Sequence, residues 1–452
     1  MSADFLYGLL PDQLLLALVV VLMVMETARL DTRWARPVFI VGVGAALAVL
    51  LQQIGAGYSA EIIAGEVRID RFALLAKAVV LACGLAVAAG FAAGFAGRGA
   101  FKFWLLLAAM LLGAGVVMGS AGFATLFIGI ELLSLPAFAL MVQGQGRTVA
   151  SEGAFKYLLM SSIGTALLLF GISLAYGSTG SLGIGAFVQA LGTASGTVDS
   201  TGDAQLQAAA LLVLCGLFLK AAVFPFHAWA PDAYASTRIE VMAILASVVK
   251  AAVVLTLVRI FGGEQLGSVT IALVAPLAIV SIVFGNLAAL GQRRFKRLLA
   301  YSSVAHAGYM VFALVDGTGS RPADLLWYTA FYALATLLAS ACYARLCPGR
   351  DDGDGDGLEA LNGQFHRHPL AALGLAFALL SLAGLPPFPG FFAKLFVFTS
   401  VIASGHLVAA VLAFVGSFLG LAVYLGIVLR LFRAESPTAA DGRSAPQPLS
   451  GA

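Results

Sequence analysis

The sequence is poor in charged residues. Only 11% of its 452 residues are Asp, Glu, Lys or Arg, against about 25% in a typical soluble domain. Apolar residues make up 61% of the chain, and the net charge of +3 is spread too thinly to form a basic face. This composition excludes an ordinary water-soluble domain and a nucleic-acid-binding surface.

Cysteine is also scarce. Cys83, Cys215, Cys342 and Cys347 lie inside or at the edge of apolar runs, and no two of them form a Cys-x-x-Cys pair. No histidine stands at metal-ligand spacing, and the chain has neither a phosphate-binding glycine loop nor a Ser/His/Asp set. We therefore expect no disulfide framework, no iron–sulfur cluster, no cofactor and no catalytic site of the soluble type.

Long apolar runs dominate the rest of the sequence. A helix needs about 20 apolar residues to cross a hydrocarbon core of about 30 Å. This length predicts an all-α polytopic membrane protein with about 13 transmembrane helices. We place the spans at residues 10–28, 37–54, 72–95, 103–119, 121–142, 154–176, 206–229, 239–261, 269–290, 298–315, 325–346, 370–404 and 407–432.

Proline interrupts two of these spans. Residues 370–404 would extend about 50 Å as one helix, which is too long for a straight crossing. Pro386 and Pro387 stand in the middle of that stretch, and Pro225 stands in the span at 206–229. Because proline removes a backbone donor and clashes with the preceding turn, we expect a discontinuous helix at each place.

Basic residues indicate the orientation in the membrane. Most lysines and arginines of the short loops fall on one side, which is the cytoplasmic side in such proteins. The opposite loops carry only Arg68, Arg71, Arg259 and Arg321. The first run, 10–28, lacks the basic start and cleavage site of a signal peptide. We expect a multi-pass protein of the bacterial inner membrane, with a periplasmic N-terminus and a cytoplasmic C-terminus.

Four ionisable side chains stand deep inside predicted spans, where each costs at least about 2.5 kcal/mol. They are Glu131, Lys220, Lys250 and Lys394. Glu131 and Lys250 are too far from either end of their spans to reach water, whereas Lys220 and Lys394 each lie beside a helix break. A buried lysine can release its proton and regain it when a carboxylate approaches, so these residues are candidates for proton translocation.

Four further residues are secondary candidates for the proton path. Lys156 and Lys77 lie near span ends, from which a lysine can reach the interface. His227 and His306 suit a proton relay, although a histidine inside a helix is often a hydrogen-bonded core residue. Relay and structural roles stay open for Lys156 and His306, and a structural role is favoured for Lys77.

An Asp/Gly run at 350–357 resembles the start of a calcium-binding loop. Asp352, Asp354 and Asp356 have suitable offsets, but Gly363 stands where the loop needs a glutamate. We expect no metal here and interpret the run as a solvated linker.

Five segments resemble a known family: residues 129–136, 155–159, 219–232, 296–309 and 384–394. They are similar to subunit N of the proton-pumping NADH:quinone oxidoreductase, respiratory complex I, one of its antiporter-like membrane subunits. The resemblance covers nearly the whole chain. It implies proton translocation coupled to quinone reduction elsewhere in the complex, with no redox site in this chain.

The resemblance also implies an internal organisation. Two inverted five-helix repeats, at 101–262 and 263–433, would follow an N-terminal three-helix segment at 1–100 and precede a polar tail at 434–452. The expected partners are the other membrane-arm subunits of complex I, the lipid bilayer and protons, with quinone reached only through the complex.

The resemblance further implies a role for each buried charge. Glu131 and Lys220 would be the charge pair of a first half-channel, Lys250 a central connector and Lys394 the charge of a second half-channel. Lys156 and His306 would be auxiliary residues of the polar axis.

Two features depart from the family pattern. Residues 236–240 read Ser-Thr-Arg-Ile-Glu in place of a Gly-Ala-Pro-Thr-Pro type turn, which predicts an ion pair between Arg238 and Glu240. No further span follows Arg433, so we predict thirteen spans where members commonly have fourteen. A subunit of a multisubunit Na⁺/H⁺ antiporter or of a membrane-bound hydrogenase stays open as an alternative, as does a scaffold whose charges only pair with one another.

Overall fold

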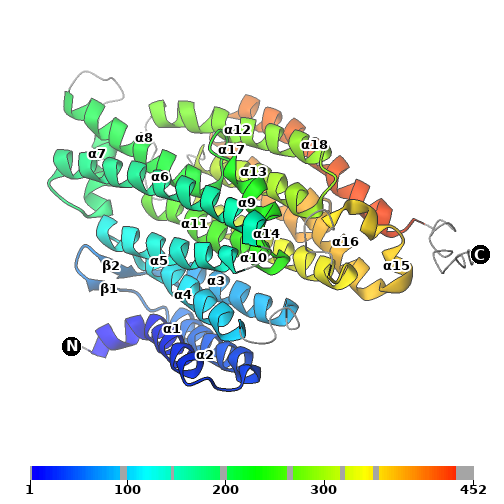
Figure 1. Ribbon diagram of the computed structural model, residues 1–452. Helices are drawn as coiled ribbons and strands as arrows, with labels where there is room; N and C mark the ends of the chain where they lie inside the picture. Colours follow the sequence, from blue (N-terminus) through cyan, green and yellow to red (C-terminus); the bar gives the residue numbers. More distant parts are fainter. Residues whose placement is uncertain are drawn as a thin grey trace, which may run out of the picture.

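The computed structural model describes residues 3–91, 99–143, 147–193, 201–261, 268–315, 321–349 and 356–433. Helices make up most of this part of the chain (Figure 1). The longer helices are α1 (Ala3–Thr27), α2 (Ala35–Gly55), α3 (Arg71–Gly90), α4 (Ala100–Gly119), α5 (Phe123–Val142), α6 (Arg147–Thr179), α8 (Thr201–Ala221), α11 (Lys250–Phe261), α12 (Ser268–Leu290), α13 (Phe295–Phe312), α14 (Arg321–Leu346), α16 (Pro369–Ala383), α17 (Pro389–Ala403) and α18 (Leu407–Leu431). The shorter ones are α7 (Ile184–Thr193), α9 (Trp229–Ala235), α10 (Ile239–Ile244), α15 (Gln364–Arg367), a π-helix at Leu245–Val249 and short 3₁₀ turns at Thr32–Trp34, Ala313–Val315 and Leu358–Leu361.

The described residues contain 12 helices that are long and apolar enough to cross a membrane. α16 and α17 have 15 residues each, about 22 Å, so each is too short to cross alone. Joined through residues 384–388, the two make one further crossing. The prediction of thirteen spans with a break at Pro386 and Pro387 is therefore confirmed.

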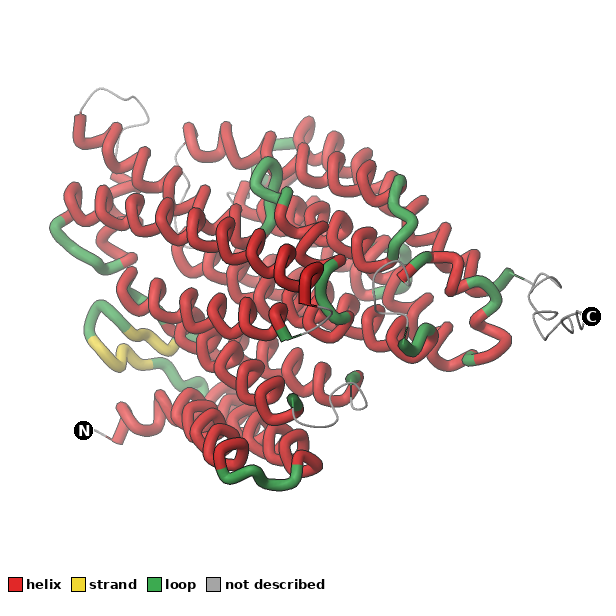
Figure 2. Tube along the Cα trace, in the orientation of Figure 1, coloured by secondary structure: helices red, strands yellow, loops and turns green. Residues whose placement is uncertain are grey.

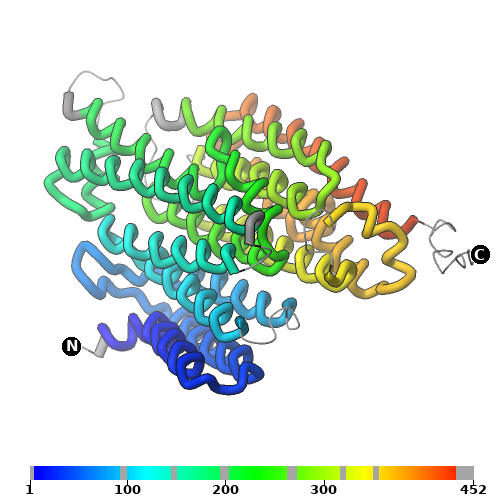
Figure 3. Tube along the Cα trace, in the orientation of Figure 1, coloured from blue at the N-terminus to red at the C-terminus, as the bar shows by residue number. Residues whose placement is uncertain are grey.

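The continuous helix Ile239–Phe261, made of α10, the π-helix and α11, lies at the centre of the bundle. All of its most apolar stretch is buried inside the protein, whereas only 28% is buried in α1 and in the span that contains α2. The outer helices therefore shield the central one from lipid. The start of α1 and the end of α18 lie at opposite ends of the bundle (Figure 3).

A β-hairpin that the sequence analysis did not predict lies at the same end as the start of α1 (Figure 2). Its antiparallel strands are β1 (Ala60–Ile63) and β2 (Val67–Ile69). Single bridges join Val67 to Ser120 and Gly122 to Gly183, so the hairpin and α7 both attach to the turn between α4 and α5. This attachment fixes the position of α5, which carries Glu131.

The Asp/Gly run is only partly described, because Asp352 and Asp354 lie outside the described residues, as does the polar tail. Asp356 is 1% exposed, and one of its carboxylate oxygens accepts a hydrogen bond from the backbone N–H of Lys296 at 3.4 Å. Burial raises the pKa of Asp356, against the opposing effect of Lys296 and Arg294. The expectation of a solvated linker is thus wrong for Asp356, which packs against the first turn of α13.

Lys77 is buried inside the bundle and pairs with a carboxylate. Its Nζ lies 2.5 Å from Asp12 Oδ2, and the Lys77 side chain is only 4% exposed. A Cβ on Gly115 would lie 2.5 Å from Asp12 Oδ1, so α4 packs directly on the carboxylate. This buried pair joins α1 to α3, in agreement with the structural role favoured for Lys77.

We predict that Asp12→Asn will lower the free energy of unfolding by about 3–5 kcal/mol, because it leaves Lys77 buried without a counter-charge. The measurement is SDS titration of the purified protein. The double variant Asp12→Leu, Lys77→Met should regain most of the loss. Equal stability of wild type and Asp12→Asn would show that the pair does not hold the N-terminal helices.

Candidate functional site

Glu131 on α5 and Lys220 on α8 form an ion pair deep in the bundle. Lys220 Nζ lies 3.5 Å from Glu131 Oε1, and the lysine side chain is 4% exposed. Lys220 also donates hydrogen bonds to Ser134 Oγ at 3.2 Å and to Ser161 Oγ at 3.0 Å. Thr165 donates from Oγ1 to Glu131 Oε1 at 2.7 Å. The amine therefore has three oxygen partners at once, and the carboxylate has a second donor of its own.

The helix that carries Lys220 is broken immediately after it, as Pro225 predicts. α8 ends at Ala221, and Ala222 has a φ of 56°, the left-handed conformation that ends many helices. Trp229, at the start of α9, donates from Nε1 to the carbonyl of Leu219 at 2.9 Å. At the end of α8 the Leu219 carbonyl thus accepts two hydrogen bonds, one from Trp229 and one from the backbone N–H of Ala222 at 3.3 Å.

Lys250 is the first residue of α11 and directly follows the π-helix. Its Nζ donates to the backbone carbonyl of Ser303 on α13 at 2.7 Å, and the residue is 2% exposed. No carboxylate pairs with it within the described part of the chain. Val249 and Val253, on either side of it, line a small cavity together with Lys220, so the first ion pair borders the central helix.

His306 lies one turn beyond Ser303 on α13 and is surrounded by tyrosines. Its Nδ1 lies 2.9 Å from the hydroxyl of Tyr328, and its Nε2 lies 3.2 Å from the hydroxyl of Tyr424. The Tyr424 hydroxyl is also 2.5 Å from Ser302 Oγ. His306 is thus fully hydrogen-bonded, an arrangement that suits a relay and a structural residue equally.

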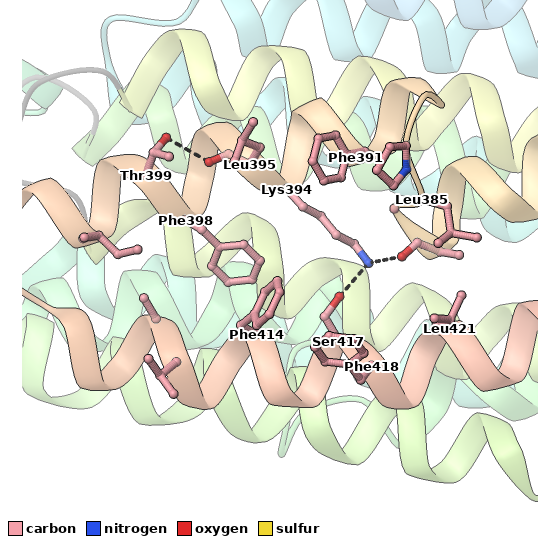
Figure 4. Close-up of a pocket in the computed structure, with 16 residues that line it drawn as sticks. Leu385, Phe391, Lys394, Leu395, Phe398, Thr399, Phe414, Ser417, Phe418 and Leu421 are labelled. Carbon is pink, nitrogen blue, oxygen red and sulfur yellow. Dashed lines mark hydrogen bonds between the residues drawn. The ribbon is translucent and has the colours of Figure 1, made fainter.

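Lys394 on α17 lies beside the second helix break. Its Nζ donates to the carbonyl of Ala383, the last residue of α16, at 2.9 Å and to Ser417 Oγ on α18 at 3.0 Å (Figure 4). The same nitrogen lies 4.7 Å from the ring centroid of Tyr309 on α13. Gly384, with a φ of 79°, ends α16 in the same way as Ala222 ends α8. Both breaks therefore place a lysine next to helix ends.

An apolar cavity of about 480 Å³ opens beside Lys394, between α17 and α18. Its wall includes Phe391, Phe398, Phe414 and Phe418, and Lys394 is its charged lining residue. Phe414 and Phe418 are about half exposed at the outer surface. An apolar partner or lipid must therefore cover this side of the second break.

Lys156 lies apart from Glu131, Lys220, Lys250, His306 and Lys394, which we call the charge row. Its side chain is 41% exposed, as expected for a lysine near a span end, and it pairs with Glu152 at 2.8 Å and with Asp232 at 2.7 Å. Arg297 on α13 lies 3.6 Å from the same aspartate. Asp232, which the sequence analysis did not single out, thus joins α6, α9 and α13 through a half-exposed ion network.

His227 occupies the first helix break and touches aromatic rings. Its ring centroid lies 5.4 Å from that of Phe224 and 4.7 Å from that of Phe284.

The predicted pair of Arg238 and Glu240 is present, with 3.2 Å between Nη2 of the arginine and Oε1 of the glutamate. The unusual segment at 236–240 therefore begins the central helix with its own ion pair.

The sequence analysis missed the hydroxyl groups that connect the charges. Ser303, His306 and Tyr309 follow one another at intervals of three residues, so they share one face of α13. That face contacts Lys250 at one end and Lys394 at the other. Ser303 Oγ and the Tyr332 hydroxyl are buried beside each other, and neither makes a hydrogen bond of good geometry among the described residues.

The family becomes clear from comparison with known proteins. A family model described as "NADH:quinone oxidoreductase/Mrp antiporter, TM" matches residues 120–420. The chain belongs to this family. The match includes every residue of the row from Glu131 to Lys394.

Individual relatives extend the likeness to nearly the whole chain. NADH-quinone oxidoreductase subunit N of Pelobacter propionicus is 50% identical over 438 residues, which are 97% of this chain and 91% of the relative. A chain of respiratory complex I from Thermus thermophilus with bound aureothin has a TM-score of 0.80 and 33% identity, covering 94% of this chain and 91% of its own length.

The fold extends beyond that complex within the family. The Mrp complex from Dietzia sp. contains a chain with a TM-score of 0.79, which covers 96% of this chain and 81% of its own length. Its identity of 24% means that the two share a fold, and the likeness says nothing further about function.

We predict that Thr165→Val will lower the free energy of unfolding by about 1.5–3 kcal/mol, because the Glu131 carboxylate loses a charge-assisted hydrogen bond. Thr165→Ser, which keeps the hydroxyl, serves as the matched control and should lose much less. SDS titration measures both. Indistinguishable losses in the two variants would mean that the hydroxyl does not support the pair.

Proposed function

We propose that this chain is the proton-translocating subunit N of an NADH:quinone oxidoreductase in a bacterial inner membrane. Its main physical support is the row of titratable groups that runs through the interior from Glu131 and Lys220 past Lys250 and His306 to Lys394. The relative at 50% identity and the likeness to a complex I chain support its place in that complex. Quinone reduction takes place in other subunits, and this chain contributes no redox site.

The Glu131–Lys220 pair is the element that changes proton affinity. At 3.5 Å the carboxylate holds the charged form of Lys220, whereas separation leaves the amine with hydroxyl partners that tolerate its neutral form. The break after α8 allows such a movement without unwinding the rest of the helix. A proton released from Lys220 then passes towards the central helix.

The second half of the path runs along α13. Lys250 and Lys394 bind backbone carbonyls and a hydroxyl, so neither leaves a carboxylate unpaired when it loses its proton. His306 and its tyrosines lie between them, and the buried hydroxyls of Ser303 and Tyr332 lie beside His306 on the same path. The second break gives Lys394 the same freedom that the first gives Lys220.

The organisation inferred from the family agrees with this path. The repeats at 101–262 and 263–433 each contain one broken helix with its lysine, behind the three-helix segment at 1–100. The opposite positions of the start of α1 and the end of α18 support termini on different sides of the membrane, and the Lys/Arg bias of the loops assigns the periplasm to the N-terminal side. Other membrane-arm subunits are the proposed neighbours, and one of them or lipid covers the cavity beside Lys394.

A subunit of a multisubunit Na⁺/H⁺ antiporter is the second candidate, because the family description includes Mrp antiporters and the fold is shared with the Mrp complex. The two functions differ in their driving force. NADH-driven pumping that is unchanged when choline replaces sodium supports the first candidate, and a strict requirement for sodium supports the second.

We predict that Lys220→Ala, Glu131→Ala and Lys394→Ala will each slow proton transfer through this chain about a hundredfold, the effect of losing a positioned proton-transfer group, and so lower the proton yield of the whole complex by the share of this chain. The measurement is the ratio of protons pumped to NADH oxidised in proteoliposomes that contain the assembled complex. Lys102→Ala is the control, because that side chain is 57% exposed and distant from the row. Wild-type ratios from all three variants would reject the path and favour a scaffold.

A further inference from the structure

Arg259, in the last turn of α11, binds three groups from other segments at the hairpin end of the bundle. Its Nη1 lies 2.5 Å from Asp70 Oδ2, its Nε donates to the carbonyl of Ser120 at 2.6 Å, and its Nη2 donates to the carbonyl of Arg68 at 3.1 Å. The arginine side chain is 10% exposed. We call these four residues the outer clamp. The planar guanidinium, with its fixed directions, holds all three partners in one geometry.

The partners of Arg259 are themselves fixed to the ends of neighbouring helices. Asp70 caps α3 by accepting a hydrogen bond from Ala73 N at 2.9 Å. Ser120 follows the last residue of α4 and pairs with Val67 of the hairpin. The outer clamp therefore attaches α11 to α3, α4 and the hairpin.

The hairpin also holds the first turn of α5. Glu66 accepts hydrogen bonds through Oε2 from Thr125 Oγ1 at 2.7 Å and from Thr125 N at 3.3 Å, and its carbonyl accepts from Ala121 N at 2.7 Å. α5 carries Glu131 and α11 carries Lys250. The same small hairpin thus sets the positions of two helices of the charge row.

Lys250 and Arg259 stand on one rigid helix, nine residues or about 13.5 Å apart. On its other side, Lys250 meets the π-helix Leu245–Val249, a wide turn of a kind found at functional sites. The π-helix separates α11 from α10, and the outer clamp anchors the opposite end of α11 through side chains. A change at Arg259 would therefore shift or rotate Lys250 away from the Ser303 carbonyl.

We propose that Arg259 is a positioning residue for Lys250, acting through the rigid helix α11 and not through contact with a proton. The expected effect on pumping rests on the proposed function, but the effect on the location of residue 250 does not. Two measurements can therefore distinguish a failure of the positioning role of Arg259 from a failure of the proposed proton-pumping function.

The first measurement follows the accessibility of residue 250 itself. In a Lys250→Cys background, a membrane-permeant maleimide is applied to the assembled complex, and modification is read from the peptide that contains residue 250. Adding Arg259→Gln should raise the modification rate about tenfold, because local opening becomes easier when charge-assisted hydrogen bonds are lost. Arg71→Gln, an exposed arginine at the same end, should leave the rate unchanged. An unchanged rate with Arg259→Gln overturns the proposal.

The second measurement is NADH-driven proton pumping with Lys250 intact. Arg259→Gln should lower the ratio of protons pumped to NADH oxidised, and Arg259→Lys, which keeps the pair with Asp70 alone, should restore part of it. Should Arg259→Gln prevent assembly, Arg259→Lys in the Lys250→Cys background takes its place in the labelling experiment. If Arg259→Gln lowers the ratio of protons pumped to NADH oxidised but leaves the labelling of residue 250 unchanged, the proposal is also overturned. Full pumping by Lys250→Ala would instead reject the proton path, and the labelling result would stay valid.

Discussion

The cost of holding an ionised side chain inside hydrocarbon is the constraint on which the arrangement of this protein depends. Each buried charge must find partners within the protein, because lipid offers none. Lys220 has a carboxylate and two hydroxyls, whereas Lys250 and Lys394 have carbonyls and a hydroxyl. These environments differ in the charge that faces the amine, because among the three lysines only Lys220 has a carboxylate partner in the described part of the chain.

Irregular backbone supplies part of these environments. A regular helix uses all of its internal carbonyls, so a lysine inside it finds no free acceptor on its own backbone. The break between α16 and α17 frees the Ala383 carbonyl for Lys394, and at the break after α8 the Leu219 carbonyl accepts hydrogen bonds from both Trp229 Nε1 and Ala222 N. The prolines that interrupt the spans are thus part of the chemistry of the site as well as of the fold.

The features that could be predicted from sequence are those with a local signal. The hydropathy and length of the apolar runs predicted the spans, and Pro225 and Pro386 predicted the helix breaks. A charged residue inside an apolar run can be recognised from the sequence alone, without knowledge of the residue that pairs with it. The contacts between distant segments could not be predicted in this way. The Ser303 carbonyl that binds Lys250 is separated from it by 53 residues, and Asp12 is separated from Lys77 by 65. The hairpin could not be predicted for the same reason, because its position depends on contacts with the distant residues Ser120 and Arg259.

Proton translocation against a gradient requires an energy source, so the identity of the partner subunits is the most direct test of the account. The chain would be extracted gently from its native membranes, and native-gel mass spectrometry would identify the proteins that migrate with it. We expect comigration with NADH-oxidising, iron–sulfur subunits. Comigration with antiporter subunits alone would contradict a redox-driven function.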